Sequence, residues 1–333
     1  AFPYPDEWTI PYALANVTKV SGRQDTGYGF LAPDLSAEKL TFAELQEEAL
    51  KRGRNLLARG LTKGDKVALI VPDPRDFVLT FLGATAVGIV PVPVYPPLSF
   101  GKLDAYVEQT ARVLTAARAK LLVTSKKAQH ILWSLVDHVR TLNGVVLVEE
   151  LGKALTADAP VPEEVLPDDI AFLQFTSGST SEPKGVVVTH RNLGANAHAI
   201  MWEGLDTDVD TDVALAWLPL YHDMGLIGFV IAPLTAGVDV YFMPTLDFIK
   251  RPSRWMRAMS QYKATISFAP NFAYGLAARR TPADVVKTLD LSRVKILGAG
   301  AEPNHPATLN AFLDHFEPAG LRRGVLNPVY GMA

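Results

Sequence analysis

The chain has 333 residues, 48% hydrophobic and 20% charged, which is the composition of a soluble globular protein that can bury one large core or two ordinary ones. Its 32 Lys and Arg nearly balance its 35 Asp and Glu, and the net charge of −3 argues against nucleic acid or an anionic membrane as the main partner. The lack of cysteine excludes a disulfide scaffold, a cysteine nucleophile, a thiolate zinc site and an iron–sulfur cluster in this chain.

Neither the N-terminal segment nor the longest apolar stretch indicates export or membrane insertion. The first 12 residues contain acidic residues and prolines where a secretory signal would have a basic end and an apolar run. The longest apolar stretch, residues 81–95, is too short to span a membrane and is interrupted by Pro91 and Pro93. We therefore expect a cytoplasmic protein that is not an integral membrane protein.

The first half of the chain predicts an α/β lobe over approximately residues 36–150. Thr41 and Glu44 form a capping box that opens an amphipathic helix ending near Arg59. Beyond it, the pattern predicts strands at 66–71, before Pro96, at 121–124 and at 145–148, with helices at 77–87, 103–117 and 128–140. Such alternation is typical of parallel sheets covered by helices.

Residues 151–169 are rich in Pro, Asp and Glu and predict a surface connection, after which the alternation restarts in a second lobe over residues 170–333. Strands are predicted at 170–175, 186–189, 213–217, 238–243, 265–268 and 294–297, and helices from 192 and at 225–234, 248–261, 272–279 and 306–316. The predicted fold is α/β, with two similar lobes whose sheets are flanked by helices. Ligands are expected at the carboxyl ends of the strands or between the lobes.

A run of Ser, Thr and Gly residues separates the predicted strands at 170–175 and 186–189. Five hydroxyl groups between Thr176 and Ser181, flexible backbone N–H groups and the cation of Lys184 together suit a polyphosphate. A Walker P-loop needs Gly-Lys-Ser/Thr at the start of a helix, whereas Lys184 and Gly185 precede a strand. The alternative for this run, taken alone, is a solvated turn.

With three further motifs in the same order, the chain resembles the adenylate-forming superfamily of acyl-CoA synthetases, luciferases and peptide-synthetase adenylation domains. The similar segments are 176–185, the aromatic and histidine segment 217–225, the glycine-rich segment 298–303 and the start of a tyrosine motif at 330–333. Segments 91–97, 221–228 and 269–274 are most similar to fatty acyl-AMP ligases. On this resemblance, the chain is a partial N-terminal AMP-binding domain that stops before its barrel subdomain is complete and lacks the small C-terminal domain.

The resemblance implies a ligase that uses ATP and Mg²⁺ to convert a fatty acid to its acyl-adenylate with release of pyrophosphate. The acyl group then passes to the phosphopantetheine thiol of an acyl carrier protein, in polyketide, lipopeptide or lipid biosynthesis. We expect the fragment alone to be inactive. Two alternatives remain: an acyl-CoA synthetase of the same fold, and a non-catalytic nucleotide-binding homologue.

The resemblance also implies roles for individual residues. Catalytic roles fall on His222 and Lys184, and a Mg²⁺ contact falls on Thr180. Nucleotide contacts fall on Thr176, Ser177, Gly178, Ser179, Thr180, Lys184, Gly298, Gly300, Ala301, Glu302, Tyr330, Gly331 and Met332. An acyl tunnel is expected among Trp217, Met224, Ile227, Phe268, Asn271, Phe272 and Tyr274.

Each role has a structural alternative. The aromatic residues could belong to the core, His222 could be an ordinary core or surface histidine, and Glu302 could cap the turn that follows it. Gly298, Gly300 and Ala301 are expected to let the backbone approach a flat base. Asp223 is expected to be a structural partner or a helix cap.

Overall fold

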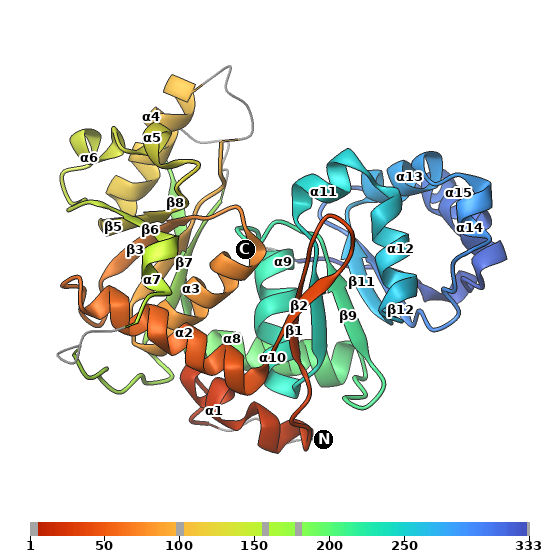
Figure 1. The fold of residues 1–333 in the computed structure, drawn as a ribbon, viewed down its shortest axis with the longest axis horizontal. Coiled ribbons are helices and arrows are strands. Elements are labelled where there is room, and N and C mark those ends of the chain that lie inside the picture. The colour runs from red at the N-terminus through yellow and green to blue at the C-terminus, as the bar shows by residue number, and fades with distance from the viewer. Residues whose placement is uncertain (1–5, 98–102, 155–159, 177–181, 332–333) are drawn as a thin grey trace.

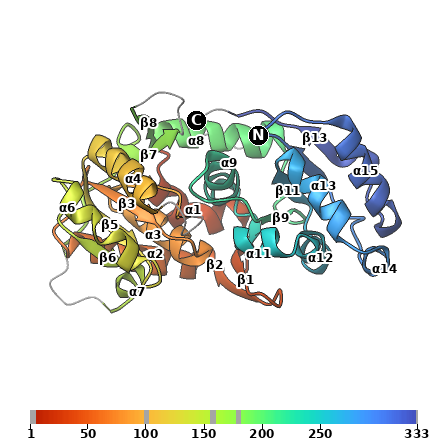
Figure 2. The same cartoon turned by 90° about the horizontal axis from the view of Figure 1, so that it is seen from above.

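Two β-sheets, each flanked by helices, lie side by side in the computed structural model (Figures 1 and 2). The structure describes residues 6–97, 103–154, 160–176 and 182–331. A four-stranded and a seven-stranded sheet form the two halves, and a two-stranded hairpin accompanies them. The predicted α/β class is therefore confirmed.

The four-stranded sheet is parallel and has the order β4-β3-β5-β6. Its strands are β3 (Lys66–Ile70), β4 (Val90–Pro93), β5 (Ala119–Thr124) and β6 (Val145–Leu147). Val67 and Leu69 of β3 lie in one hydrophobic cluster, and Ala68 and Ile70 lie in the other. This alternation is the two-residue period of a strand that is covered on both faces.

Helices cover both faces of this sheet. One face carries α2 (Phe42–Leu57), α3 (Pro74–Ala86) and α7 (Val148–Leu151), and the other carries α4 (Leu103–Ala117), α5 (Gln129–Leu132) and α6 (Leu135–His138). The predicted capping box of Thr41 and Glu44 opens α2. The single helix predicted at 128–140 is instead two short ones.

Helices α2 and α3 touch through their backbones. A Cβ added to Gly83 would overlap the carbonyl oxygen of Ala49, and one added to Gly53 would overlap the carbonyl oxygen of Gly83. Nearly every residue of α3 is buried, so this helix is apolar around its whole circumference, as a helix inside a core must be. The paired glycines let it lie directly on α2.

The seven-stranded sheet has the order β13-β12-β11-β9-β10-β1-β2. Its strands are β1 (Gly27–Leu31), β2 (Ala37–Thr41), β9 (Val213–Ala216), β10 (Asp239–Phe242), β11 (Ile266–Ala269), β12 (Ile296–Ala299) and β13 (Leu326–Pro328). Neighbouring strands are parallel except for β1 and β2. The carboxyl ends of the parallel strands therefore lie along one edge.

The helices of this half include two π-helical stretches. Its α-helices are α1 (Ile10–Ser21), α8 (His190–His198), α9 (Asp223–Gly225), α10 (Ala232–Ala236), α11 (Thr245–Lys250), α12 (Ser253–Gln261), α13 (Asn271–Arg280), α14 (Ala283–Val286) and α15 (Pro306–Phe316). The π-helices η2 (Ala199–Gly204) and η3 (Leu226–Ile231) continue α8 and α9, and the 3₁₀ turns η4 (Glu317–Ala319) and η5 (Arg323–Val325) precede β13. The helix predicted at 248–261 is interrupted before α12, where Pro252 cannot continue the hydrogen bonding of α11.

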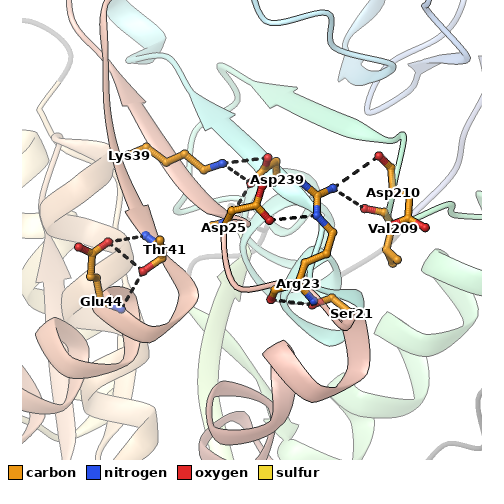
Figure 3. A network of polar contacts seen from close by, with 10 residues as sticks. Ser21, Arg23, Asp25, Lys39, Thr41, Glu44, Val209, Asp210 and Asp239 are labelled. Atoms are coloured by element: carbon orange, nitrogen blue, oxygen red, sulfur yellow. Dashed lines mark hydrogen bonds and ion pairs between the residues drawn. The ribbon is translucent and has the colours of Figure 1, made fainter.

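The N-terminal strands belong to the second sheet, so the sheets do not divide at the expected boundary near residue 36. β1 pairs with β10, and β2 forms the edge next to β1. Lys39 and Asp239 form an ion pair at 2.8 Å, and Asp239 also accepts a hydrogen bond from the Gly27 backbone N–H at 2.7 Å (Figure 3). Arg23 binds Asp25 and the backbone carbonyl of Val209 in the same network.

The hairpin of β7 (Ile170–Thr176) and β8 (Lys184–Thr189) follows the acidic connection and forms its own antiparallel sheet. Leu173 and Phe175 pack in the cluster around α4 and β5, which belongs to the first half of the chain. Ala171 and Phe172 lie in the larger cluster. Phe172 contacts Phe81 of α3, so the segment predicted to open the second lobe packs against the first half of the chain.

Candidate active site

Four motif segments leave the same edge of the seven-stranded sheet. β9, β11, β12 and β13 are parallel neighbours, and their carboxyl ends continue into residues 217–225, 270–274, 300–303 and 329–331. In an open parallel sheet, this edge is where ligands bind. The topology therefore brings together segments that are more than a hundred residues apart in the sequence.

His222 lies at the start of α9 and is paired with its neighbour Asp223. Its Nδ1 is 2.6 Å from Asp223 Oδ1, and the imidazole is 55% exposed. This hydrogen bond raises the pKa of His222 above its usual value and, from the other side, lowers the pKa of Asp223. The Met224 N–H donates to Asp223 Oδ1 at 2.7 Å. It also lies 3.3 Å from Nδ1, but an Nδ1 that carries a proton cannot accept, so Asp223 is its acceptor.

The hydrogen bond between His222 and Asp223 influences whether the Nε2 atom of His222 donates or accepts a hydrogen bond. A neutral imidazole with its proton on Nδ1 presents Nε2 as an acceptor, whereas the imidazolium presents an Nε2–H donor. An anionic ligand needs the donor. By raising the pKa of His222, Asp223 favours the protonated form that can bind an anion. The expectation that Asp223 has a supporting role agrees with this geometry.

Gln174, for which no role was predicted, connects the hairpin to the histidine segment. Its buried side chain donates from Nε2 to the backbone carbonyl of Tyr221 at 3.0 Å. Its Oε1 is buried and has no hydrogen-bond partner among the residues that the structure describes. A polar residue inside the apolar strand Ile170–Thr176 was the available signal. The strand that leads into the predicted phosphate loop is thereby fastened next to His222.

Gly298 in β12 and Gly300 just after it are required by protein packing. A Cβ on Gly298 would lie 2.7 Å from the ring of Phe268, and one on Gly300 would lie 2.6 Å from the carbonyl oxygen of Val329. Ala301 follows with a φ of 63°, in the left-handed region that non-glycine residues rarely adopt. The expected reason for small residues, close approach to a base, is therefore not the only one.

Glu302 does not cap the turn that follows it. Its carboxylate accepts a hydrogen bond from the backbone N–H of Phe272 at 2.6 Å, at the start of α13. Tyr330 is 91% exposed just beyond β13, as a ring that stacks on a ligand requires, and Gly331 beside it is exposed. The segments after β11, β12 and β13 thus lie next to one another along one edge of the sheet.

The residues predicted to line an acyl tunnel divide into two groups. Met224, Ile227 and Phe268 are half-buried against the core, and Phe272 is 45% exposed. Trp217 and Tyr274 are instead buried, as the alternative of core aromatics predicts: Trp217 stacks on Phe248 with 3.7 Å between ring centroids, and Tyr274 packs against Trp255 and Phe312. Asn271 is buried, and its side chain is engaged with a backbone N–H.

Much of the predicted phosphate loop lies outside the described residues. Ser177, Gly178, Ser179, Thr180 and Met332 are not described, and of Thr176 only the backbone pairing with Lys184 is. Lys184 is exposed at the start of β8 and forms no ion pair with any described residue. The described ranges contain no group of three or more His, Asp or Glu side chains that could hold a metal.

Two hollows lie beside the motif segments. A groove of about 990 Å³ runs between α4, α6 and residues 182–183, and a cavity of about 30 Å³ lies between residues 71–77 and 218–221. No predicted site residue lines either one. Within the described residues, no helix is both long enough and apolar enough to cross a bilayer.

Comparison with known proteins supplies the remaining observations. Residues 27–333 match the family described as AMP-binding enzyme. A provisionally named acyl-CoA synthetase of Caulobacter vibrioides is 37% identical over 301 residues, which cover 89% of this chain and 51% of that protein. The medium-chain fatty acid–acyl carrier protein ligase TtuA of Teredinibacter turnerae is 32% identical over an alignment of 338 positions, and the match covers 90% of this chain and 52% of the ligase.

The fold of this chain is similar to that of a solved structure. It comes from a study of fatty acyl-adenylate ligases from E. coli and L. pneumophila, and it matches with a TM-score of 0.91 at 32% identity over 99% of this chain and 58% of the other. The chain spans about half the length of the curated relatives that it matches.

Proposed function

Because the chain belongs to the AMP-binding enzyme family, we propose that it provides the nucleotide-binding and acyl-binding part of a fatty acyl-AMP ligase. The observation that carries this proposal is the meeting of His222, the segment after Gly298 and Tyr330 at one edge of the sheet. The likeness to solved fatty acyl-adenylate ligases supports a fatty acid as the substrate.

In the first half-reaction, an oxygen of the fatty carboxylate attacks the α-phosphorus of ATP. The new bond joins that oxygen to phosphorus, the bond from the α-phosphorus to the bridging oxygen breaks, and pyrophosphate leaves. A fatty carboxylate is already ionised at neutral pH, so no general base is required. The contribution of the protein is alignment and stabilisation of charge.

His222 and Lys184 supply this stabilisation in the proposal. The imidazolium of His222 donates from Nε2 to the incoming carboxylate or to an α-phosphate oxygen. Lys184 and the hydroxyl groups of the loop hold the β- and γ-phosphates. Mg²⁺, when bound, neutralises charge between phosphate oxygens, and the hydroxyl of Thr180 suits such a hard cation.

In the second half-reaction, the phosphopantetheine thiol of an acyl carrier protein attacks the carbonyl carbon of the adenylate. A thioester forms, AMP leaves, and the thiol proton goes to solvent. The likeness to TtuA supports a carrier protein as the acceptor, and we place the reaction in cytoplasmic polyketide, lipopeptide or lipid biosynthesis. The likeness to the Caulobacter vibrioides protein favours coenzyme A as a second candidate acceptor.

The test uses the full-length protein with a series of fatty acids. ATP–pyrophosphate exchange that depends on the fatty acid is the expected result for the first half-reaction. The acyl product is then captured with holo-carrier protein or with coenzyme A, and apo-carrier protein without the phosphopantetheine arm is the control. Capture by coenzyme A alone would replace the proposed acceptor. No exchange with any fatty acid would leave a non-catalytic nucleotide-binding protein.

A further inference from the structure

Three hydrogen bonds fasten the first turn of α13 to β12 and the segment that follows it. Glu302 accepts from the Phe272 N–H at 2.6 Å, Asn271 Oδ1 accepts from the His305 N–H at 2.9 Å, and the Tyr274 hydroxyl donates to the Gly298 carbonyl at 2.8 Å. They span both ends of the glycine-rich segment. We call this set of contacts the α13 clamp.

Helix α13 has no cap of its own. Pro270 precedes it and makes no side-chain cap hydrogen bond, and its first turn contains no acidic residue. The first N–H groups of a helix need acceptors from outside, and a carboxylate there also interacts favourably with the helix dipole. Glu302 supplies this acceptor from a segment 30 residues away in the sequence.

In the α13 clamp, each segment donates a hydrogen bond to the other. The clamp therefore fixes the distance between the two segments as well as capping α13. His305 precedes α15 and has no side-chain cap hydrogen bond of its own, and it donates its N–H back to Asn271 of α13. In the same turn of α13, Tyr274 is fully buried and donates from its hydroxyl to the Gly298 carbonyl. The two segments therefore cannot slide past each other without breaking buried or charged hydrogen bonds.

We infer that Glu302 is a positioning residue that sets the distance between the nucleotide-contacting segment 298–301 and the acyl-contacting turn 271–272. This inference rests on the proposed function, because the two segments are predicted to contact different substrates. Loss of the carboxylate frees the first turn of α13 and the strained loop at Ala301 together. Both substrates are then held less well, because Glu302 acts through the two segments that it joins.

The experiment compares Glu302→Ala, Glu302→Gln and the control Glu317→Ala in the full-length protein. Glu317 is an exposed glutamate in the turn after α15, outside the clamp. For Glu302→Ala we expect kcat/KM for ATP and kcat/KM for the fatty acid both to fall about tenfold, the factor that one capping interaction represents. Glutamine keeps an acceptor oxygen, so Glu302→Gln should stay within about threefold of wild type. The control should be unchanged.

Two other outcomes would overturn the inference. A lower melting temperature with both kcat/KM values within twofold of wild type would reduce the α13 clamp to a structural cap and overturn the inference. A loss confined to ATP would indicate direct nucleotide contact and would also overturn it.

A second measurement keeps this test separate from that of the proposed function. Hydrogen exchange at the Phe272 amide reports the clamp directly and should become about tenfold faster in Glu302→Ala but not in Glu302→Gln. If the wild-type protein shows no fatty-acid-dependent exchange of pyrophosphate, the proposed function fails. ATP binding then replaces the kinetic readout: an unchanged affinity in Glu302→Ala, or an unchanged Phe272 exchange rate, overturns the inference.

Discussion

Replacing Asp223 by asparagine should move the pH dependence of adenylate formation to lower pH. Asparagine has the same shape and can still accept from the His222 Nδ1–H and from the Met224 N–H, but it carries no charge. In the native protein, the hydrogen bond to Asp223 raises the pKa of His222. The imidazolium is therefore fully present at low pH and is lost as the pH rises through that raised pKa. Without the carboxylate, this loss occurs at lower pH.

The size of the effect follows from the hydrogen bond that the imidazolium can donate. A hydrogen bond to a charged group contributes about 1.5–3 kcal/mol. Because the His222 side chain is 55% exposed, screening by water places the expected value near the lower end. About 1.5 kcal/mol corresponds to roughly a tenfold change in rate. His222→Ala should therefore slow adenylate formation about tenfold at a pH where the native imidazole is protonated.

The assay is the initial rate of fatty-acid-dependent pyrophosphate release, measured from about pH 6 to 9 in the wild type, Asp223→Asn and His222→Gln. At the acidic end, where His222 is protonated in both proteins, Asp223→Asn should approach the wild-type rate. At higher pH, the rate of Asp223→Asn should fall below the wild-type rate. His222→Gln has no imidazole and should lack this limb of the profile. If the rate of Asp223→Asn falls at the same pH as that of the wild type, or at a higher pH, the reasoning is refuted.

Three further substitutions test other parts of the structure. Lys184→Ala should slow ATP–pyrophosphate exchange about 10- to 150-fold, because one charge-assisted contact to phosphate is lost; an unchanged rate would remove Lys184 from the site. Gln174→Leu deprives the part-buried Tyr221 carbonyl of its donor and should lower kcat for adenylate formation about three- to tenfold. Equal kcat values would show that this link does not position His222. Gly83→Ala should lower the free energy of unfolding in urea by about 1–3 kcal/mol through overlap with the α2 backbone, whereas an unchanged midpoint would contradict that contact.

Elements with strong local patterns could be predicted from the sequence. Helices α4 and α15 have the expected bounds, 103–117 and 306–316, because their apolar periodicity is complete within the segment. The N-terminal strands had no such pattern. β1 contains two glycines, and β2 is a polar edge strand whose pairing depends on β10, far away in the sequence. No local window contains that contact.

The candidate site also has parts that could be predicted from the sequence and parts that could not. The segments that carry His222, Gly298 and Tyr330 were identifiable by residue type and order, and the topology places them at one edge. The burial of Tyr274 and the use of Glu302 as a cap for α13 depend on how helices pack against the strand ends. In the sequence, Tyr274 suits a binding site or a core, and Glu302 suits a nucleotide contact or a cap. Their surroundings, which only the fold supplies, distinguish the two.

The pairing of β1 with β10 also constrains the order of events during synthesis. Gly27 and its partner Asp239 are 212 residues apart, and ribosomes add roughly 5–20 residues per second. The β1–β2 hairpin therefore leaves the ribosome roughly 10–40 s before the strand that completes its pairing. Its edge is open for that time, and such an edge can pair with other chains. Assembly of the second sheet thus joins an early pair of strands to a strand that is made 212 residues later.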